Sequence, residues 1–97
     1  MISSVSAQGE AYASAYAASK AGFNGLAKSL AYELGSDGIN VNAIAPGWVR
    51  TDMAQSILHT KALERDNLAA TMQNRCIEPE EISNLVKYLL SKEARAI

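Results

Sequence analysis

The fold of this chain is decided by the stretch from Tyr16 to Met53, "YAASKAGFNGLAKSLAYELGSDGINVNAIAPGWVRTDM". Its first half is rich in alanine, leucine, lysine and glutamate, which predicts a helix over residues 13–34 with Gly35 as its C-terminal cap. Its second half alternates apolar and polar residues over 39–45 and then stops at "PGW", which predicts a strand followed by a turn. A helix leading into a strand in this way is typical of an α/β protein.

One face of the predicted helix carries an apolar stripe that begins with two polar groups. With about 100° of rotation per residue, six side chains fall on this face. They are Tyr16, Lys20, Phe23, Ala27, Leu30 and Leu34. A lysine on a core-facing stripe needs a partner, because burying an unpaired charge is costly. Tyr16 lies one turn earlier, where an ammonium favours the phenolate form, so the pair can serve as an acid–base group.

A second tyrosine, Tyr12, competes for the same assignment. It has no lysine four residues further on, since position 16 is itself a tyrosine. It is also expected at or before the start of the helix. The spacing therefore selects Tyr16.

The flanking segments complete a strand–helix–strand–helix order. Residues 1–7, "MISSVSA", read as the end of a strand that enters a loop at Gly9. Residues 51–74 predict one or two loose helices, with 57–72 as the best candidate. Pro79 begins a closing helix, whose apolar residues repeat at helical spacing: Ile82, Leu85, Val86, Leu89 and Leu90. This order predicts a βαβα segment with parallel strands. Because two strands do not make a stable parallel sheet, we expect the segment to be the C-terminal part of a larger fold.

Composition and charge exclude several classes of function. The chain has 97 residues, 20% of them charged, and a net charge of −1, so neither nucleic acid nor a membrane is expected as a partner. No secretory signal is recognised, and a cytoplasmic location is expected. Cys76 is the only cysteine, which excludes an internal disulfide, and His59 has no visible second ligand, so we expect no metal site.

Linked motifs over essentially the whole chain resemble those of the short-chain dehydrogenase/reductase family. They are Tyr-x-x-x-Lys in the long helix, "INVNAIAPG" as the next strand and turn, "RCIEPEEISNLVKYLLSKEA" as the closing helix, and "ISSVSA" as the strand end that bears the family's serine. The resemblance implies an α/β fold in which residues 1–97 form a single segment, the C-terminal βαβα part of a Rossmann-like doubly wound parallel sheet that is incomplete in this chain.

The resemblance implies a hydride transfer between NAD or NADP and a small-molecule carbonyl or alcohol. Tyr16 is the general acid or base at the substrate oxygen, and Lys20 supports it while binding the ribose of the cofactor. A serine holds the substrate oxygen beside Tyr16. The spacing of 13 residues before Tyr16 points to Ser3, whereas the local "ISS" pattern points to Ser4, which we favour.

The turn "PGWVRT" follows a predicted parallel strand, and such sheets bind ligands at the carboxyl ends of their strands. The resemblance implies that this turn meets the nicotinamide. Pro46 and Gly47 would shape the contact, with Gly47 letting the backbone turn and approach the ligand. By resemblance, the main chain of Val49 bonds the carboxamide and Thr51 offers its hydroxyl. Trp48 either walls the substrate side or serves as a packing aromatic.

The sequence also departs from the family's pattern. No glycine-rich pyrophosphate loop is present, and Ile77 stands where the family often has glycine. The isolated segment is therefore expected to be a truncated and inactive form of an oxidoreductase. The alternative is a non-catalytic, self-associating fragment that forms a homo-oligomer through the helix over residues 13–34.

Overall fold

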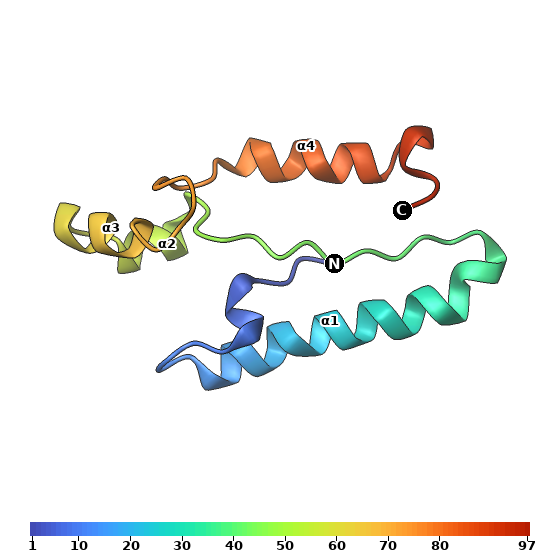
Figure 1. Cartoon of the computed structure of the whole chain (residues 1–97), viewed down its shortest axis with the longest axis horizontal. Helices are drawn as coiled ribbons and strands as arrows, with labels where there is room; N and C mark the ends of the chain where they lie inside the picture. The colour runs from blue at the N-terminus through green and yellow to red at the C-terminus, as the bar shows by residue number, and fades with distance from the viewer. The chain divides into compact units, whose positions relative to one another are not determined.

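The computed structural model describes all 97 residues, and Figure 1 traces them from the N-terminus to the C-terminus. Four α-helices and three short 3-10 helices form its regular structure. They are η1 (Val5–Gln8), α1 (Ser14–Leu34), η2 (Gly35–Asp37), α2 (Asp52–Ile57), α3 (Lys61–Leu68), α4 (Pro79–Leu89) and η3 (Lys92–Ala94). None of these helices combines the length and the apolar character needed to span a lipid bilayer. The chain divides into two compact units, one of residues 1–46 and 88–97 and the other of residues 47–87.

The long helix α1 of the first unit confirms the helix predicted from the sequence, beginning one residue later at Ser14. Its predicted stripe is covered only in part: Ala27 is buried, and Lys20, Leu30 and Leu34 are half-buried. Tyr16 and Phe23, on the same stripe, are exposed at 39% and 37%. Tyr32, which lies off the stripe, is exposed. η1 packs against α1 in this unit (Figure 1). The apolar period therefore identified the covered face from Ala27 onward, whereas its first aromatic residues stay accessible.

Gly35 is the C-cap of α1, as predicted, but it is not the left-handed residue of the turn. The helix stops at Leu34, but Gly35 keeps a right-handed backbone with φ −61° and starts the 3-10 turn η2. The left-handed residue is Gly38, with φ 76°, and its N–H donates to the carbonyl of Gly35 at 3.0 Å. The glycine that the turn requires for its conformation is thus the second one of "GSDG".

The segments 1–7 and 39–45 do not form the strands predicted for them. They meet at a single parallel bridge between Ile2 and Ile44. Ser3 N–H donates to Ile44 O at 2.7 Å, and Ile44 N–H donates to Met1 O at 2.9 Å. The N-terminal ammonium of Met1 donates to Asn42 O at 2.8 Å, and just beyond the second segment Val5 N–H donates to Pro46 O at 3.1 Å. The parallel sense agrees with the prediction. A longer ladder does not form, because η1 begins at Val5 and turns the chain away, and each segment pairs along only one edge.

Two asparagines of the segment 39–45 hold the C-terminal residues of the same unit. The Nδ2 of Asn40 donates to the carbonyl of Arg95 at 3.0 Å, and the Nδ2 of Asn42 donates to Ile97 O at 3.1 Å. Ala94, within η3, is fully buried. The polar positions that the alternating pattern assigned to one face of a strand are therefore used as side-chain anchors.

The second unit contains two short helices, α2 and α3, within residues 51–74, as predicted. The best candidate, 57–72, includes the whole of α3 but is too long. Thr51 caps α2 by accepting from the N–H of Ala54 at 3.3 Å, and Thr60 caps α3 by accepting from the N–H of Leu63 at 3.2 Å. Thr60 has an extended backbone, φ −121° and ψ 150°, which no continuous helix allows. The prediction of 57–72 is wrong because a side-chain cap inside that range begins a new helix.

The closing helix α4 begins at Pro79, as predicted. Just before it, Ile77 forms a parallel bridge with Val49. Ile77 N–H donates to Trp48 O at 2.7 Å, and the N–H of Arg50 donates to Ile77 O at 2.9 Å. Ile77, which stands where the family often has glycine, thus pairs with Val49 in this unit.

Candidate active site

The first unit brings Tyr16 and Lys20 together on α1. They lie one helical turn apart, and the Nζ of Lys20 is 5.5 Å from the centre of the Tyr16 ring. The same Nζ is 5.4 Å from the ring centre of Phe23 and donates to the carbonyl of Ile2 at 3.1 Å. The ammonium is therefore anchored against the N-terminal segment, between two aromatic rings that favour a cation.

Tyr12, the competing tyrosine, lies outside α1. Its backbone is left-handed, with φ 63°, and its side chain is fully exposed. The turn that holds it is closed by the N–H of Ala13, which donates to Glu10 O at 3.3 Å. Its placement before the helix confirms the expectation from the sequence.

The two serines have different surroundings. Ser3 is buried, 3% exposed, and its hydroxyl donates to the main-chain carbonyl of Lys20 at 3.0 Å. Ser4 is half-buried and caps η1, since its oxygen accepts from the N–H of Ser6 at 3.1 Å. Its hydroxyl also donates to the Oγ of Ser6 at 3.1 Å. Ser3 thus joins the N-terminal segment to α1, whereas Ser4 is the N-cap of η1 and has more of its surface accessible.

The turn residues are divided between the units, with Pro46 in the first and Gly47 onward in the second. Pro46 accepts the hydrogen bond of Val5 described above. Gly47 does not have a positive φ, so the conformational reason expected for this glycine does not hold. A Cβ built at Gly47 meets no atom within 4 Å, so the chain's own packing does not require glycine there.

Val49 and Thr51 lie on either side of Arg50 in the second unit. The pairing with Ile77 uses the carbonyl of Trp48 and the N–H of Arg50, so the main-chain groups of Val49 take no part in it. In a parallel pairing these groups point to the opposite edge. The hydroxyl of Thr51 accepts from Ala54 as a helix cap and makes a long contact of 3.4 Å with Val49 O.

Two arginines of this unit, Arg50 and Arg75, form ion pairs that were not predicted from the sequence. The Nε of Arg50 donates to Glu78 at 2.9 Å, and its guanidinium lies 3.9 Å from Glu64 of α3. The bond to Glu78 raises the pKa of Arg50. Arg75 forms a two-pronged pair with Glu81, at 2.7 and 2.8 Å, which lowers the pKa of Glu81 to about 2. No spacing rule could have found the first pair, because its partners are 28 residues apart.

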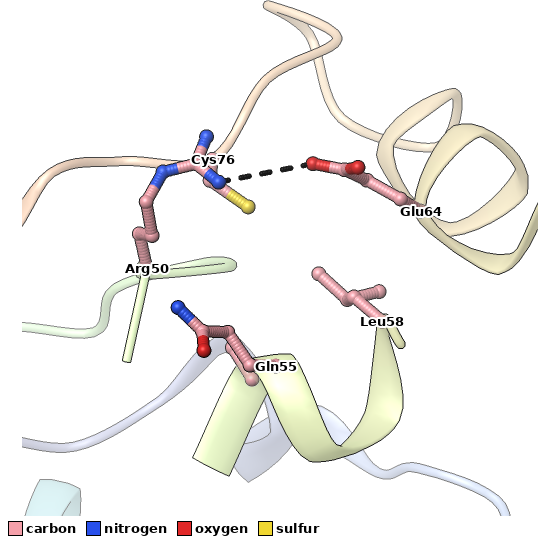
Figure 2. A pocket seen from close by; sticks show the side chains of 6 residues that line it. Arg50, Gln55, Leu58, Glu64 and Cys76 are labelled. Carbon is pink, nitrogen blue, oxygen red and sulfur yellow. Dashed lines mark ion pairs between the residues drawn. The ribbon is translucent and has the colours of Figure 1, made fainter. Parts of the chain in front are cut away.

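A shallow hollow lies beneath Arg50. Figure 2 shows Arg50 and Glu64 facing each other across it, with Gln55 and Leu58 on another side and the sulfur of Cys76 near the guanidinium. Its volume of about 200 Å³ is below the roughly 300–1,000 Å³ of most small-molecule sites. Cys76 is buried, and His59 is exposed with its Nδ1 3.2 Å from Ser56 O.

The whole chain, residues 1–97, matches the protein family described as enoyl-(acyl carrier protein) reductase. The 3-oxoacyl-acyl-carrier-protein reductase FabG of Vibrio harveyi is 44% identical over an alignment of 97 residues, which covers 96% of this chain and 37% of the relative. A 3alpha-hydroxysteroid dehydrogenase of Mediterraneibacter gnavus is 45% identical over 92 residues, 95% of this chain and 36% of that protein. The chain thus spans little more than a third of the length of these relatives.

Solved structures show the same likeness. A 4-hydroxyisoleucine dehydrogenase complexed with NADH matches with a TM-score of 0.91 and 36% identity, over 99% of this chain and 40% of that one. An actinorhodin polyketide ketoreductase variant with NADPH matches with a TM-score of 0.91 and 35% identity, over 99% of this chain and 41% of that one. These likenesses support an α/β fold. With the family match over the full chain, they show that the protein is a member of the short-chain dehydrogenase/reductase family.

Proposed function

We propose that this chain carries the acid–base group and the nicotinamide contacts of an NAD(P)-dependent oxidoreductase that interconverts a carbonyl and an alcohol. The observation that carries the proposal is the position of the Lys20 ammonium, 5.5 Å from the Tyr16 ring centre on the same face of α1. A nicotinamide dinucleotide would supply or accept the hydride. The relatives that span more of the fold include enzymes solved with NADH and with NADPH, and the choice between the two stays open.

Tyr16 is the residue that exchanges a proton with the substrate oxygen. In the reducing direction its hydroxyl donates the proton as the carbonyl carbon gains the hydride, and in the oxidising direction the phenolate takes the proton back. Lys20 is assigned the supporting cation, since it lies one helical turn from Tyr16 with its Nζ 5.5 Å from the ring centre. The bond from Lys20 to Ile2 O fixes the ammonium at this end of the helix. A ribose hydroxyl of the cofactor is a further partner for it.

Ser4, rather than Ser3, is the serine that holds the substrate oxygen. Ser3 is 3% exposed and donates its only hydroxyl proton to the carbonyl of Lys20, so it is committed to the fold. The hydroxyl of Ser4 is bonded only to its neighbour Ser6, and such a local bond is easily exchanged for a substrate.

The residues of the turn fit the nicotinamide end of such a cofactor. The main-chain groups of Val49 are left out of the pairing with Ile77, which makes them suitable for a carboxamide. Thr51 has a hydroxyl beside them, and Gly47 offers the open space that a flat ring needs. Pro46 ends the preceding segment and lacks an N–H of its own.

Binding is tested with the one tryptophan of the chain, Trp48, which directly precedes Val49. Titration with NADH and with NADPH is expected to quench Trp48 emission saturably and to produce energy transfer to the reduced nicotinamide. The oxidised dinucleotides, which do not absorb the tryptophan emission, serve as the optical control. A flat titration with both reduced forms contradicts the proposed cofactor contacts.

Chemistry is tested by comparing two tyrosines that lie four residues apart in the sequence. In an active form of the protein, Tyr16→Phe is expected to lower turnover at least about a hundredfold, the usual worth of a general acid or base. Tyr12→Phe is the matched control, because it removes the same atom from an exposed residue outside the helix, and it is expected to retain turnover. Equal turnover of the two variants contradicts the role given to Tyr16.

Self-association through α1 is a second candidate function, favoured by the apolar side chains that this helix leaves exposed. They are Tyr16, Phe23, Leu26 and Tyr32. Pairing with another copy would remove this surface from water. Light scattering is expected to give a mass above that of one chain, and Leu26→Lys is expected to shift it toward one chain. A folded single chain at all concentrations contradicts this second function.

A further inference from the structure

Arg50 is attached to three other residues of the second unit. Its N–H is bonded to Ile77, its Nε donates to Glu78 at 2.9 Å, and its guanidinium lies 3.9 Å from Glu64 on α3. Three parts of the unit thus meet at one side chain: the segment after the turn, the segment before α4, and α3. Figure 2 shows the arm toward Glu64 reaching across the hollow between them.

The neighbours of Arg50 are the two residues assigned to the nicotinamide. A main-chain contact such as that of Val49 depends on the orientation of two peptide planes, and one of these planes carries the N–H of Arg50. The two hydrogen bonds with Ile77 hold that segment at one point only. An isolated bridge of this kind has no neighbouring ladder to stiffen it, so a side-chain attachment can decide its order.

The geometry of the Arg50–Glu78 pair suits this purpose. It runs alongside the bridge, since Glu78 directly follows Ile77 and Arg50 directly follows Val49. Backbone pairing and side-chain pairing thus join the same two segments in consecutive positions. Both side chains are about half exposed, so the pair adds little to stability and its effect is expected on local order instead.

We propose that Arg50 is a positioning residue: through Glu78 it fixes the segment 48–51 so that Val49 and Thr51 present their polar groups to the nicotinamide. The proposal rests on the function proposed above for Val49 and Thr51. Arg50 itself is not assigned a contact with the cofactor, because Glu78 already occupies its Nε. The weaker arm to Glu64 connects the same segment to α3.

The test combines two measurements on Trp48, which lies in the positioned segment. Acrylamide quenching of its emission without cofactor reports the order of the segment, and titration with NADH and NADPH reports binding. The variants are Arg50→Gln, Glu78→Gln, the double variant, and Arg50→Lys. Arg75→Gln is the matched control, since it breaks a pair of similar exposure in the same unit, 46% and 43% against 47% and 48%.

Arg50→Gln and Glu78→Gln are each expected to weaken dinucleotide binding about three- to tenfold, the usual range for losing one charge-assisted hydrogen bond. The double variant is expected to bind the dinucleotide as tightly as the single variant with the lower affinity, because each substitution breaks the same contact. Arg50→Lys recovers part of the affinity, since it keeps a cation. Acrylamide quenching rises in both single variants and stays at the wild-type level in Arg75→Gln. Circular dichroism verifies that every variant is folded.

Several results overturn the proposal. Unchanged affinity and quenching in Arg50→Gln would remove its role, and an equal loss in Arg75→Gln would show a general weakening of the unit. If the double variant lost affinity by the product of the two single-variant factors, Arg50 would act independently of Glu78. A wild-type chain that binds neither NADH nor NADPH contradicts the proposed function and with it the purpose given to Arg50. The acrylamide measurement distinguishes that failure, because it needs no cofactor.

Discussion

The hydroxyl of Ser3 donates to the main-chain carbonyl of Lys20 at 3.0 Å, while the side chain of Lys20 donates to the carbonyl of the residue before Ser3 at 3.1 Å. The two bonds run in opposite directions between the same two segments. Each segment thus supplies one side-chain donor and one main-chain acceptor. This exchange fixes the start of the chain against the end of α1 that carries Tyr16.

Ser3→Ala is expected to lower the free energy of unfolding by about 1–2 kcal/mol, because it deletes a buried hydrogen bond and leaves a carbonyl short of a donor. Ser4→Ala is the comparison in the adjacent position. In an active form it is expected to lower turnover about a hundredfold, as for one lost donor to a reacting oxygen. Urea unfolding and turnover separate the two effects. A larger loss of turnover in Ser3→Ala than in Ser4→Ala would reverse the assignment.

Lys20→Met is expected to loosen the N-terminal segment, because it removes the donor to Ile2 O and the cation beside the two rings. Hydrogen exchange of the Ser3 and Val5 amides should become faster. Lys28→Met is the control, since Lys28 is an exposed lysine of the same helix. If both variants exchange at the wild-type rate, the anchoring described for Lys20 does not stabilise the segment.

Gly38→Ala is expected to destabilise the chain by about 1 kcal/mol, because alanine is strained at a positive φ. Gly35→Ala, three residues earlier, is expected to be neutral or to stabilise by about 0.4–1 kcal/mol, since its backbone is already helical. No atom of the chain lies within 4 Å of a Cβ at either position, so packing does not confuse the comparison. Thermal unfolding of the two variants measures the difference. The opposite order would place the left-handed residue at Gly35.

Acid is expected to weaken the start of α4 through Glu81. Arg75 lowers the pKa of Glu81 to about 2 from an ordinary value of 4.5, so the carboxylate stabilises the folded state fully above pH 4.5. That contribution is lost as the pH falls from 4.5 through about 2. Glu81→Gln should flatten this part of the stability profile, measured by circular dichroism. Glu80→Gln is the control one residue earlier, and a profile flattened equally by both would show that the pair with Arg75 is not the cause.

The helices could be predicted from the sequence because their signals are local. The composition of residues 14–34 and the proline at position 79 act within a few turns of the backbone that they shape. The tyrosine–lysine spacing is local in the same sense, so its common face on α1 followed from the helix alone.

The strands and the ion pairs could not be predicted in this way. The alternation at 39–45 is a correct sign of an extended segment, but a strand also needs partners on its edges, and only Ile44 enters a bridge. The pair of Arg50 with Glu78 depends on how the chain returns after 28 residues. The break in the range 57–72 at Thr60 has a different reason. A threonine within a helix gives little signal in the sequence, but here its hydroxyl accepts from the N–H of Leu63 and begins α3.

The hydroxyl of Thr51 has one proton and two lone pairs, and α2 uses only a lone pair. Its proton makes a poor contact of 3.4 Å, so it can be given to another acceptor at no cost to the helix. Serine at this position would keep both the accepted and the donated hydrogen bond, whereas valine would lose both. The Thr51 hydroxyl can therefore cap α2 and donate a hydrogen bond to a bound ligand at the same time.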